Sequence, residues 1–209
     1  MKLRYLPLAL LAFTPLTSQA DTLGVRVGGG SWDHDPSGTV RYQSTLATDD
    51  ADLDNDLNLQ DKKEGYLFVV VEHPLPLIPN LRIMSTALQN AGTGTVTTSF
   101  DYGGQTFSAS DSVTTDLTLD HTDFTVYWQI FDNVVSLDLG LNLKAVDATS
   151  TLVNNTTSTT VTNSFDGIIP MGYVAVGVSP IEGLEIRAEV SALSVGDSSI
   201  TDSTAKIMY

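Results

Sequence analysis

The sequence predicts an all-β fold, a transmembrane antiparallel up-and-down β-barrel with about eight strands present. Two observations lead to it: segments of alternating apolar and polar residues recur, and the connections between them are alternately short and long. A strand points successive side chains to opposite faces. In an outer-membrane barrel the apolar face meets lipid, the polar face lines the interior, and short turns and long loops lie at opposite ends. The alternative is a soluble β-sandwich or lipocalin-like barrel with the apolar face in a core.

The first 20 residues have the pattern of a secretory signal peptide. Lys2 and Arg4 are followed by an apolar stretch from Leu6 to Phe13, and Ser18-Gln19-Ala20 forms a small-x-small cleavage site. We therefore expect Sec-type export, removal of residues 1–20, and one barrel domain over residues 21–209. No later apolar run is long enough to span a membrane as a helix, so a membrane-inserted mature chain would cross as strands.

The mature chain is strongly acidic and has no cysteine. Removal of Lys2 and Arg4 with the leader leaves 8 basic residues against 25 acidic ones and changes the formal net charge from −15 to −17. Nucleic acid is therefore excluded as an expected partner, because phosphate contacts need clustered Lys and Arg. An exported chain without disulfides depends on packing or on closed strand pairing for stability.

The alternation is clearest in residues 134–145. Val135 and every second residue up to Ala145 are apolar, whereas Ser136, Asp138 and Lys144 lie on the other parity. Most of the strand-like segments are close to the 9–11 residues of a tilted membrane-crossing strand. They are residues 22–32, 65–73, 81–88, 119–131, 134–145, 168–178, 184–193 and 205–209.

The connections sort into two kinds. Residues 74–80, 132–133 and 179–183 are short and rich in Pro, Asn or Gly. The others are polar and rich in Asp, Thr, Ser and Asn, and we expect them to form long acidic extracellular loops. They are residues 33–63, 89–118, 147–164 and, shorter but in the same phase, 196–203.

Several segments together resemble a family of small bacterial outer-membrane β-barrel proteins with a Gly-rich first strand. These segments are "DTLGVRVGGGSW", "EHPLPLIPN", "GGQTFSA", "DNVVSLDLGL" and "SALSVGDSSITD", and the resemblance covers most of residues 21–209. It implies an outer-membrane location and fold, and no assigned activity or catalytic residues. Family members continue for about two more strands, which implies a C-terminally truncated chain and about ten strands in the complete protein. In the alternative interpretation, Tyr209 is itself the C-terminal aromatic residue that acts as the assembly signal.

Charged residues occupy polar alternate positions of the predicted strands, and we expect their side chains to face the interior. Small barrels fill their interior with side chains, and opposite charges there should pair because an unpaired buried ion is costly. We therefore expect a plugged lumen and a structural or surface-interaction role. The second hypothesis is a narrow channel for small solutes or cations. The predicted interior charges are Arg26, Glu72, Arg82, His121, Asp123, Asp138, Lys144, Glu185, Arg187, Glu189 and Lys206.

His121 and Asp123 share one strand face and raise a third hypothesis, a surface hydrolase. Such an enzyme needs a His, a carboxylate and a Ser within hydrogen-bond reach. His-x-Asp is a weak signal, and an interior hydrogen-bonded pair is the favoured interpretation. We expect no enzyme, no cofactor and no metal, since no His cluster with metal-ligand spacing is present.

Asp52, Asp54 and Asp56 occupy positions 1, 3 and 5 of a calcium-binding EF-hand pattern. Leu57 and Lys63 stand where that loop requires Gly and Glu, so the EF-hand interpretation fails. Two interpretations of this loop remain: it binds divalent cations weakly, or it is simply an acidic loop exposed to solvent. The partners expected overall are outer-membrane lipid with lipopolysaccharide, the outer-membrane assembly machinery, and divalent cations at such loops.

Overall fold

The computed structural model describes residues 23–43, 50–75 and 77–208. These residues form strands, turns and irregular segments. Among them there is no helix long and apolar enough to cross a membrane. The predicted signal peptide and Tyr209 lie outside the described residues, so both remain predictions.

One large antiparallel sheet organises the chain, and this confirms the all-β antiparallel prediction. Within the described residues, each of the segments predicted from alternation overlaps one of its strands. In sheet order these are β1 (Gly24–His34), β4 (Lys62–Glu72), β5 (Asn80–Thr86), β9 (Ser112–Asp132), β10 (Val135–Asn154), β11 (Thr159–Ile181), β12 (Leu184–Val195) and β13 (Ser198–Met208). A ninth strand, β6 (Gln89–Thr95), continues the line of β5 along β9.

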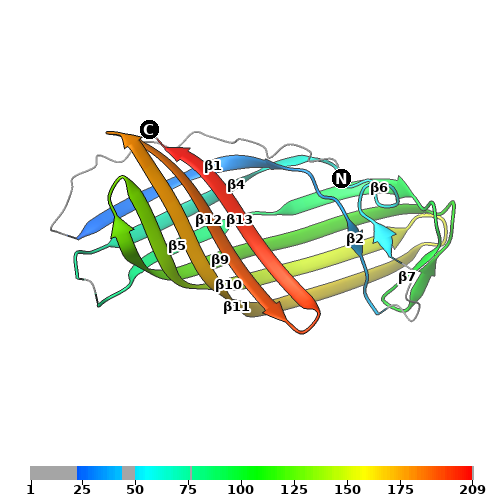
Figure 1. Cartoon of the computed structure of the whole chain (residues 1–209). Coiled ribbons are helices and arrows are strands. Elements are labelled where there is room, and N and C mark those ends of the chain that lie inside the picture. Colours follow the sequence, from blue (N-terminus) through cyan, green and yellow to red (C-terminus); the bar gives the residue numbers. More distant parts are fainter. Residues whose placement is uncertain (1–22, 44–49, 76, 209) are drawn as a thin grey trace.

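The sheet is strongly curled into a half-barrel, and β12 and β13 turn back across its concave face (Figure 1). Each strand pairs with the next one along the chain, as in an up-and-down barrel. Within the described residues β1 pairs only with β4 and β13 only with β12, so the sheet has two edges. Closure into a full barrel remains a prediction.

The apolar parity lies on the convex, exposed side of the sheet. On β10 the side chains of Leu139, Leu141 and Leu143 are exposed, whereas Asp138 and Asn142 on the other parity are almost fully buried. Neighbouring strands follow the same rule. The exposed apolar residues of this band are Val25, Val27, Leu67, Val69, Phe124, Trp128, Ile130, Val135, Leu139, Leu141, Leu143, Ile168, Val174, Val176, Val178, Ile186, Val190 and Ile207.

Part-way along the long strands, the apolar residues change from the outward-facing parity to the inward-facing parity. Beyond Ala145 on β10, Leu152 turns inward and is buried, whereas Asp147, Thr149 and Thr151 lie on the outward parity. β9 and β11 invert at the same level, where Asp147 is paired with Asp120 on one side and Asp166 on the other. The outer surface therefore has an apolar band near the turns at residues 133–134 and 182–183, and a polar zone toward the opposite end of the long strands.

A hydrophobic core fills the concave side of the polar zone. Its buried members are Ala51, Leu57, Leu59, Val96, Phe100, Tyr102, Phe107, Val113, Leu152 and Val161. Most of them come from residues 35–43, 50–61 and 96–111, which we call the cap. The cap contains two small sheets, formed by β2 (Thr39–Val40) with β3 (Ala51–Asp52) and by β7 (Phe100–Tyr102) with β8 (Gln105–Phe107).

The predicted long loops are therefore wrong in extent. Residues 147–164 are mostly the paired ends of β10 and β11, and only residues 155–158 separate these strands. Residues 89–118 include β6, β7, β8 and the start of β9. Thr favours strands despite its polarity, and Thr–Thr pairs such as Thr151 with Thr162, with 3.2 Å between the hydroxyl oxygens, tie adjacent strands together.

The glycines of β1 make room for aromatic rings on β4. A Cβ at Gly28 would lie 2.6 Å from Cζ of Phe68, and a Cβ at Gly30 would lie 2.8 Å from the hydroxyl oxygen of Tyr66. Both glycines stand opposite these residues in the β1–β4 ladder. The two rings therefore lie over the β1 backbone on the inner face, which explains why the first strand is rich in glycine.

A substitution at Gly140 on β10 should destabilise the wall of the half-barrel. A Cβ there would lie 2.1 Å from the carbonyl oxygen of Val126 and 2.8 Å from Cα of Tyr127, both backbone atoms that cannot turn away. We expect Gly140→Ala to lower the free energy of unfolding by about 1–3 kcal/mol in urea titrations. Gly172→Ala is the matched control, because its nearest neighbour is at 3.8 Å. Equal stability of the two variants would contradict this packing.

Candidate functional site

A network of ion pairs lies on the concave face below the cap. Every Asp, Glu, Lys and Arg predicted to face the interior makes at least one ion pair there, and His121 lies beside Asp123. The pairs form a central group, a group near the cap, and a group near the short turns.

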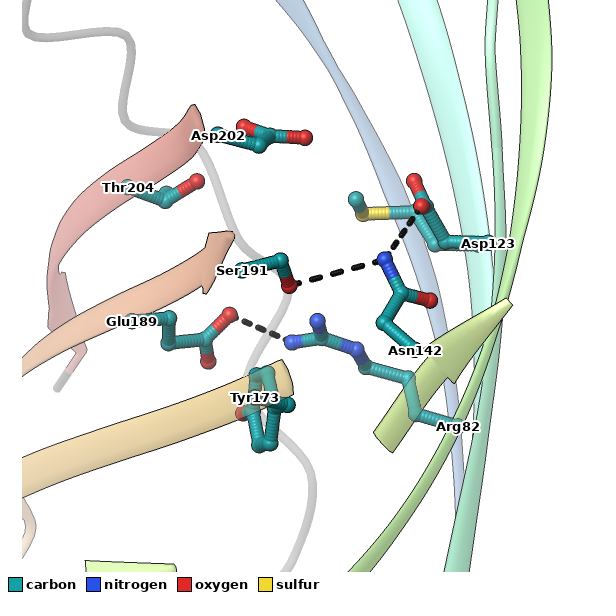
Figure 2. A pocket seen from close by; sticks show the side chains of 9 residues that line it. Arg82, Asp123, Asn142, Tyr173, Glu189, Ser191, Asp202 and Thr204 are labelled. Atoms are coloured by element: carbon teal, nitrogen blue, oxygen red, sulfur yellow. Dashed lines mark hydrogen bonds and ion pairs between the residues drawn. The ribbon is translucent and has the colours of Figure 1, made fainter. Parts of the chain in front are cut away.

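Glu189 on β12 is the hub of the central group. Its carboxylate accepts hydrogen bonds from Arg82 on β5, from Nε of Arg187 at 3.0 Å, and from Nζ of Lys206 on β13 at 3.0 Å. Figure 2 shows Arg82 and Glu189 reaching toward each other from opposite walls. The Arg82 guanidinium also lies 5.2 Å from the ring centre of Tyr173, a cation–π contact. The Arg82–Glu189 pair joins β5 and β12, which are far apart in the sheet order.

Arg187 extends the central group to two further carboxylates. Its guanidinium is hydrogen-bonded to Asp138 on β10, whose side chain is only 1% exposed, and lies 3.5 Å from Glu185. An Arg suits this place because its planar group presents several donors at once. A buried charge without such partners would cost several kcal/mol.

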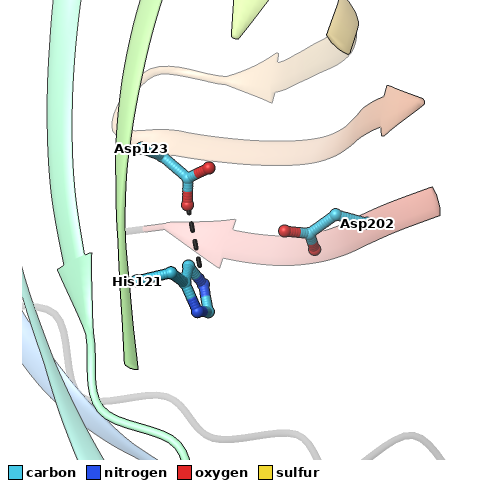
Figure 3. Close-up of side chains that lie close together, drawn as sticks. All are labelled: His121, Asp123 and Asp202. Carbon is cyan, nitrogen blue, oxygen red and sulfur yellow. Dashed lines mark ion pairs between the residues drawn. The ribbon is translucent and has the colours of Figure 1, made fainter. Parts of the chain in front are cut away.

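The group near the cap is centred on Asp123 of β9. Its two carboxylate oxygens lie 2.9 and 3.0 Å from Nζ of Lys144, and Nδ2 of Asn142 donates to the carboxylate at 2.6 Å. Nζ of Lys144 also lies 3.0 Å from Asp202 on β13. His121 completes the group, with its Nε2 3.7 Å from Oδ2 of Asp123 (Figure 3).

The third group lies near the short turns. Arg26 on β1 is 2.7 Å from Oε1 of Glu72 on β4, and the Tyr127 hydroxyl donates to the same oxygen at 2.7 Å. Arg26 keeps 40% of its side chain exposed, so this pair is more hydrated than the central group. Its contribution to stability is correspondingly smaller.

Little free space remains between the central group and the group near the cap. The cavity there has a volume of ≈ 20 Å³ and is lined by both charged and neutral polar side chains. This is room for about one water molecule. Its lining residues are Arg82, Met84, Asp123, Asn142, Tyr173, Glu189, Ser191, Asp202 and Thr204.

Several members of the network are not among the interior residues predicted from the sequence. Asp202 falls in the loop predicted over residues 196–203, but β13 begins at Ser198 and places Asp202 beside Lys144. Tyr127, Asn142 and Tyr173 are uncharged and so are absent from the predicted set of charges. All three share the inward parity of their strands, so parity was the signal that could have identified them.

The geometry does not build a hydrolase site around His121 and Asp123. The Asp123 carboxylate is engaged by Lys144 and Asn142, and Nδ1 of His121 is hydrogen-bonded to the backbone oxygen of Leu119. Among the hydrogen bonds of the described residues, none joins a serine hydroxyl to His121. The hydrolase hypothesis therefore has no geometric support.

The acidic loop around Asp52 also does not gather its carboxylates into a cation site. Oδ1 of Asp52 accepts the backbone amides of Asp54 and Asn55 at 3.0 and 2.8 Å. Asp56 accepts the amide of Thr97 at 2.7 Å and the amide of Asp52 at 3.0 Å. Asp52 thus stabilises the turn itself, and Asp56 ties the turn to residues 96–111 of the cap. The three carboxylates form no metal-sized cluster within the described chain.

No family model matches the chain, and no curated protein matches its sequence. The resemblance to small outer-membrane barrel proteins remains a prediction from the quoted segments.

Removal of the negative charge of Glu189 should weaken the half-barrel strongly. Glu189→Gln leaves Arg82, Arg187 and Lys206 without their shared carboxylate, and breaking a buried pair costs about 3–5 kcal/mol. We expect a loss of that size in the free energy of unfolding, measured by urea titration. Glu185→Gln should cost much less, because Glu185 is 29% exposed and 3.5 Å from its partner. An unchanged free energy of unfolding in the Glu189→Gln variant would show that the network is not needed for the curl.

The cap should loosen in acid. Burial alone would raise the pKa of Asp56, but hydrogen bonds from the Thr97 hydroxyl and backbone and from the Asp52 amide outweigh it and lower this pKa below 3.8. Asp56 therefore stabilises the cap above its ordinary pKa, and this contribution is lost as the pH falls through the lowered value. We expect the protection of residues 96–111 against hydrogen exchange, relative to the rate of an unfolded chain at the same pH, to fall below pH 3.8.

Asp56→Asn should produce a similar loosening at neutral pH, with a loss of about 1–3 kcal/mol in local stability. Asp54→Asn is the control, because Asp54 is exposed at the same turn. Equal exchange rates in the two variants would refute the role of the Asp56 carboxylate.

Proposed function

We propose that the chain is a bacterial outer-membrane β-barrel protein with a closed interior, serving as a structural or surface-interaction element of that membrane. The observation that carries this proposal is the sidedness of the sheet. Its exposed convex face is a continuous apolar band, and its concave face holds paired charges. A soluble sheet would bury the first face and hydrate the second.

The dimensions of the apolar band support a bilayer as its solvent. On β10 the band runs from Val135 to Ala145, and on β11 from Ile168 to Val178. At about 3.3 Å per residue and a tilt of about 40°, such a run covers about 25 Å of depth. That is the height of the apolar band of outer-membrane barrels. The polar zone beyond it would then stand in water on the cell surface, with the cap.

A water-exposed position of the band is disfavoured. Soluble monomers rarely expose contiguous apolar patches larger than a few hundred Å². Here the exposed apolar side chains extend over strands β1, β4 and β9 to β13. In a bilayer the same residues are favourably placed, and unpaired strand edges become costly. The proposal therefore includes pairing of the β1 and β13 edges, with each other or with further strands.

The channel hypothesis receives less support. The ion pairs of the central group reach across the hollow of the half-barrel, and the cavity between the groups has room for about one water molecule. The cap packs over the end of the half-barrel next to the polar zone. We expect the purified protein to leave planar bilayers without steady conductance. A reproducible single-channel current would replace the closed-barrel proposal with the channel.

The chain's two tryptophans allow a direct test of membrane insertion. Trp128 lies in the apolar band, whereas Trp32 lies on the inward parity of β1, with its ring centre 4.8 Å from that of His34. We expect lipid with brominated acyl chains to quench strongly the fluorescence of the Trp32→Phe variant, which retains Trp128. Trp128→Phe, which keeps Trp32, should be quenched several-fold less. Equal, weak quenching in the two variants, with protein remaining outside the vesicles, would overturn the membrane proposal.

A further inference from the structure

His121, Asp123 and Asp202 place one nitrogen and two carboxylate oxygens within 4.8 Å of one another. His121 and Asp123 come from β9 and Asp202 from β13, which are not neighbours in the sheet. Figure 3 shows the Asp202 carboxylate pointing toward the other two side chains. We propose that these residues form a binding site for a transition-metal dication, with Zn²⁺ as the best fit. The proposal concerns the interior geometry and does not depend on membrane insertion.

The orientation of His121 supports a ligand role. Its Nδ1 lies 3.0 Å from the backbone oxygen of Leu119, which can only accept a hydrogen bond, so Nδ1 carries the hydrogen. In the neutral ring Nε2 then has the free lone pair, and this atom faces Oδ2 of Asp123 at 3.7 Å. Two acceptors facing each other need a cation or a proton between them. A hydrogen bond from the second ring nitrogen to a carbonyl is also the usual support of a metal-binding histidine.

The local charge balance also favours a further cation. The Asp123 and Asp202 carboxylates share one ammonium group, that of Lys144. With a neutral His121 the group therefore carries one uncompensated negative charge, next to an Asp123 side chain that is only 2% exposed. A dication would exceed this deficit by one charge, so Lys144 should compete with the metal for the two carboxylates.

The site has space and access. The cavity of ≈ 20 Å³ borders Asp123 and Asp202 and could hold a water as the fourth ligand, as in zinc sites with three protein ligands (Figure 2). Asp202 keeps 42% of its side chain exposed, which gives a path from solvent. One imidazole and two carboxylates match Zn²⁺, whereas Ca²⁺ and Mg²⁺ prefer oxygen ligands alone. A bound metal would tie β13 to β9 across the concave face.

The test is Zn²⁺ titration of the folded, untagged full chain by calorimetry, with Co²⁺ absorption as a report on the ligands. We expect one metal per chain in the wild type. His121→Ala and Asp202→Asn should each weaken binding by about tenfold or more. His73→Ala is the control, because His73 lies in the turn between β4 and β5, with its Nε2 3.2 Å from the backbone oxygen of Pro79, and should bind as the wild type does.

Lys144→Met should strengthen binding, because it removes the competing ammonium, and the gain should vanish when His121→Ala is added. If neither the wild type nor Lys144→Met binds Zn²⁺ more tightly than its His121→Ala counterpart, the site is an ion-pair cluster only and the proposal is overturned. Urea titration of each variant without metal separates a lost ligand from a lost fold.

Discussion

The buried carboxylate of Glu189 is the constraint on which the curl of the sheet depends. Its side chain is 8% exposed, and cations from β5, β12 and β13 surround it. A carboxylate at this place without those partners would be strongly unfavourable. Because β5 and β12 are separated in the sheet by β9, β10 and β11, the partners can meet only if the sheet closes toward itself. The curvature and the ion pairs therefore require each other.

The long strands serve two different surroundings. Along β10 the apolar side chains face outward up to Ala145, and from Leu152 onward they face a core formed with the cap. The backbone ladder runs through this change without interruption, since pairing does not depend on which face is apolar. Strand β10 thus has its apolar residues on the outer face at one end and on the inner face, in contact with a hydrophobic core, at the other.

The group around His121 lies where these two halves meet. It is the part of the network nearest to the cap, it includes the partly exposed Asp202, and it borders the cavity. The carboxylates of the central group, by contrast, are each paired with a guanidinium or ammonium group. The interior therefore combines a charge-paired middle with one polar group that is proposed to bind a metal.

The sequence by itself determined which residues lie on which face, because the two-residue period of a strand is a local property. It identified the segments, the phase of the short turns and the interior position of charges such as Arg82 and Glu189. It failed in residues 89–118 and 147–164, where polar Thr-rich stretches looked like loops but pair as strands.

Only the tertiary structure decided which interior charges meet. Lys144 with Asp202, and Arg82 with Glu189, are brought together by the curl of strands that are not adjacent, and no spacing along the chain records that curl. The same holds for the role of Asp56, which depends on where Thr97 folds back within the cap. The alternation of a strand is set by its own backbone, whereas the partner of a buried charge is set by the shape of the whole sheet.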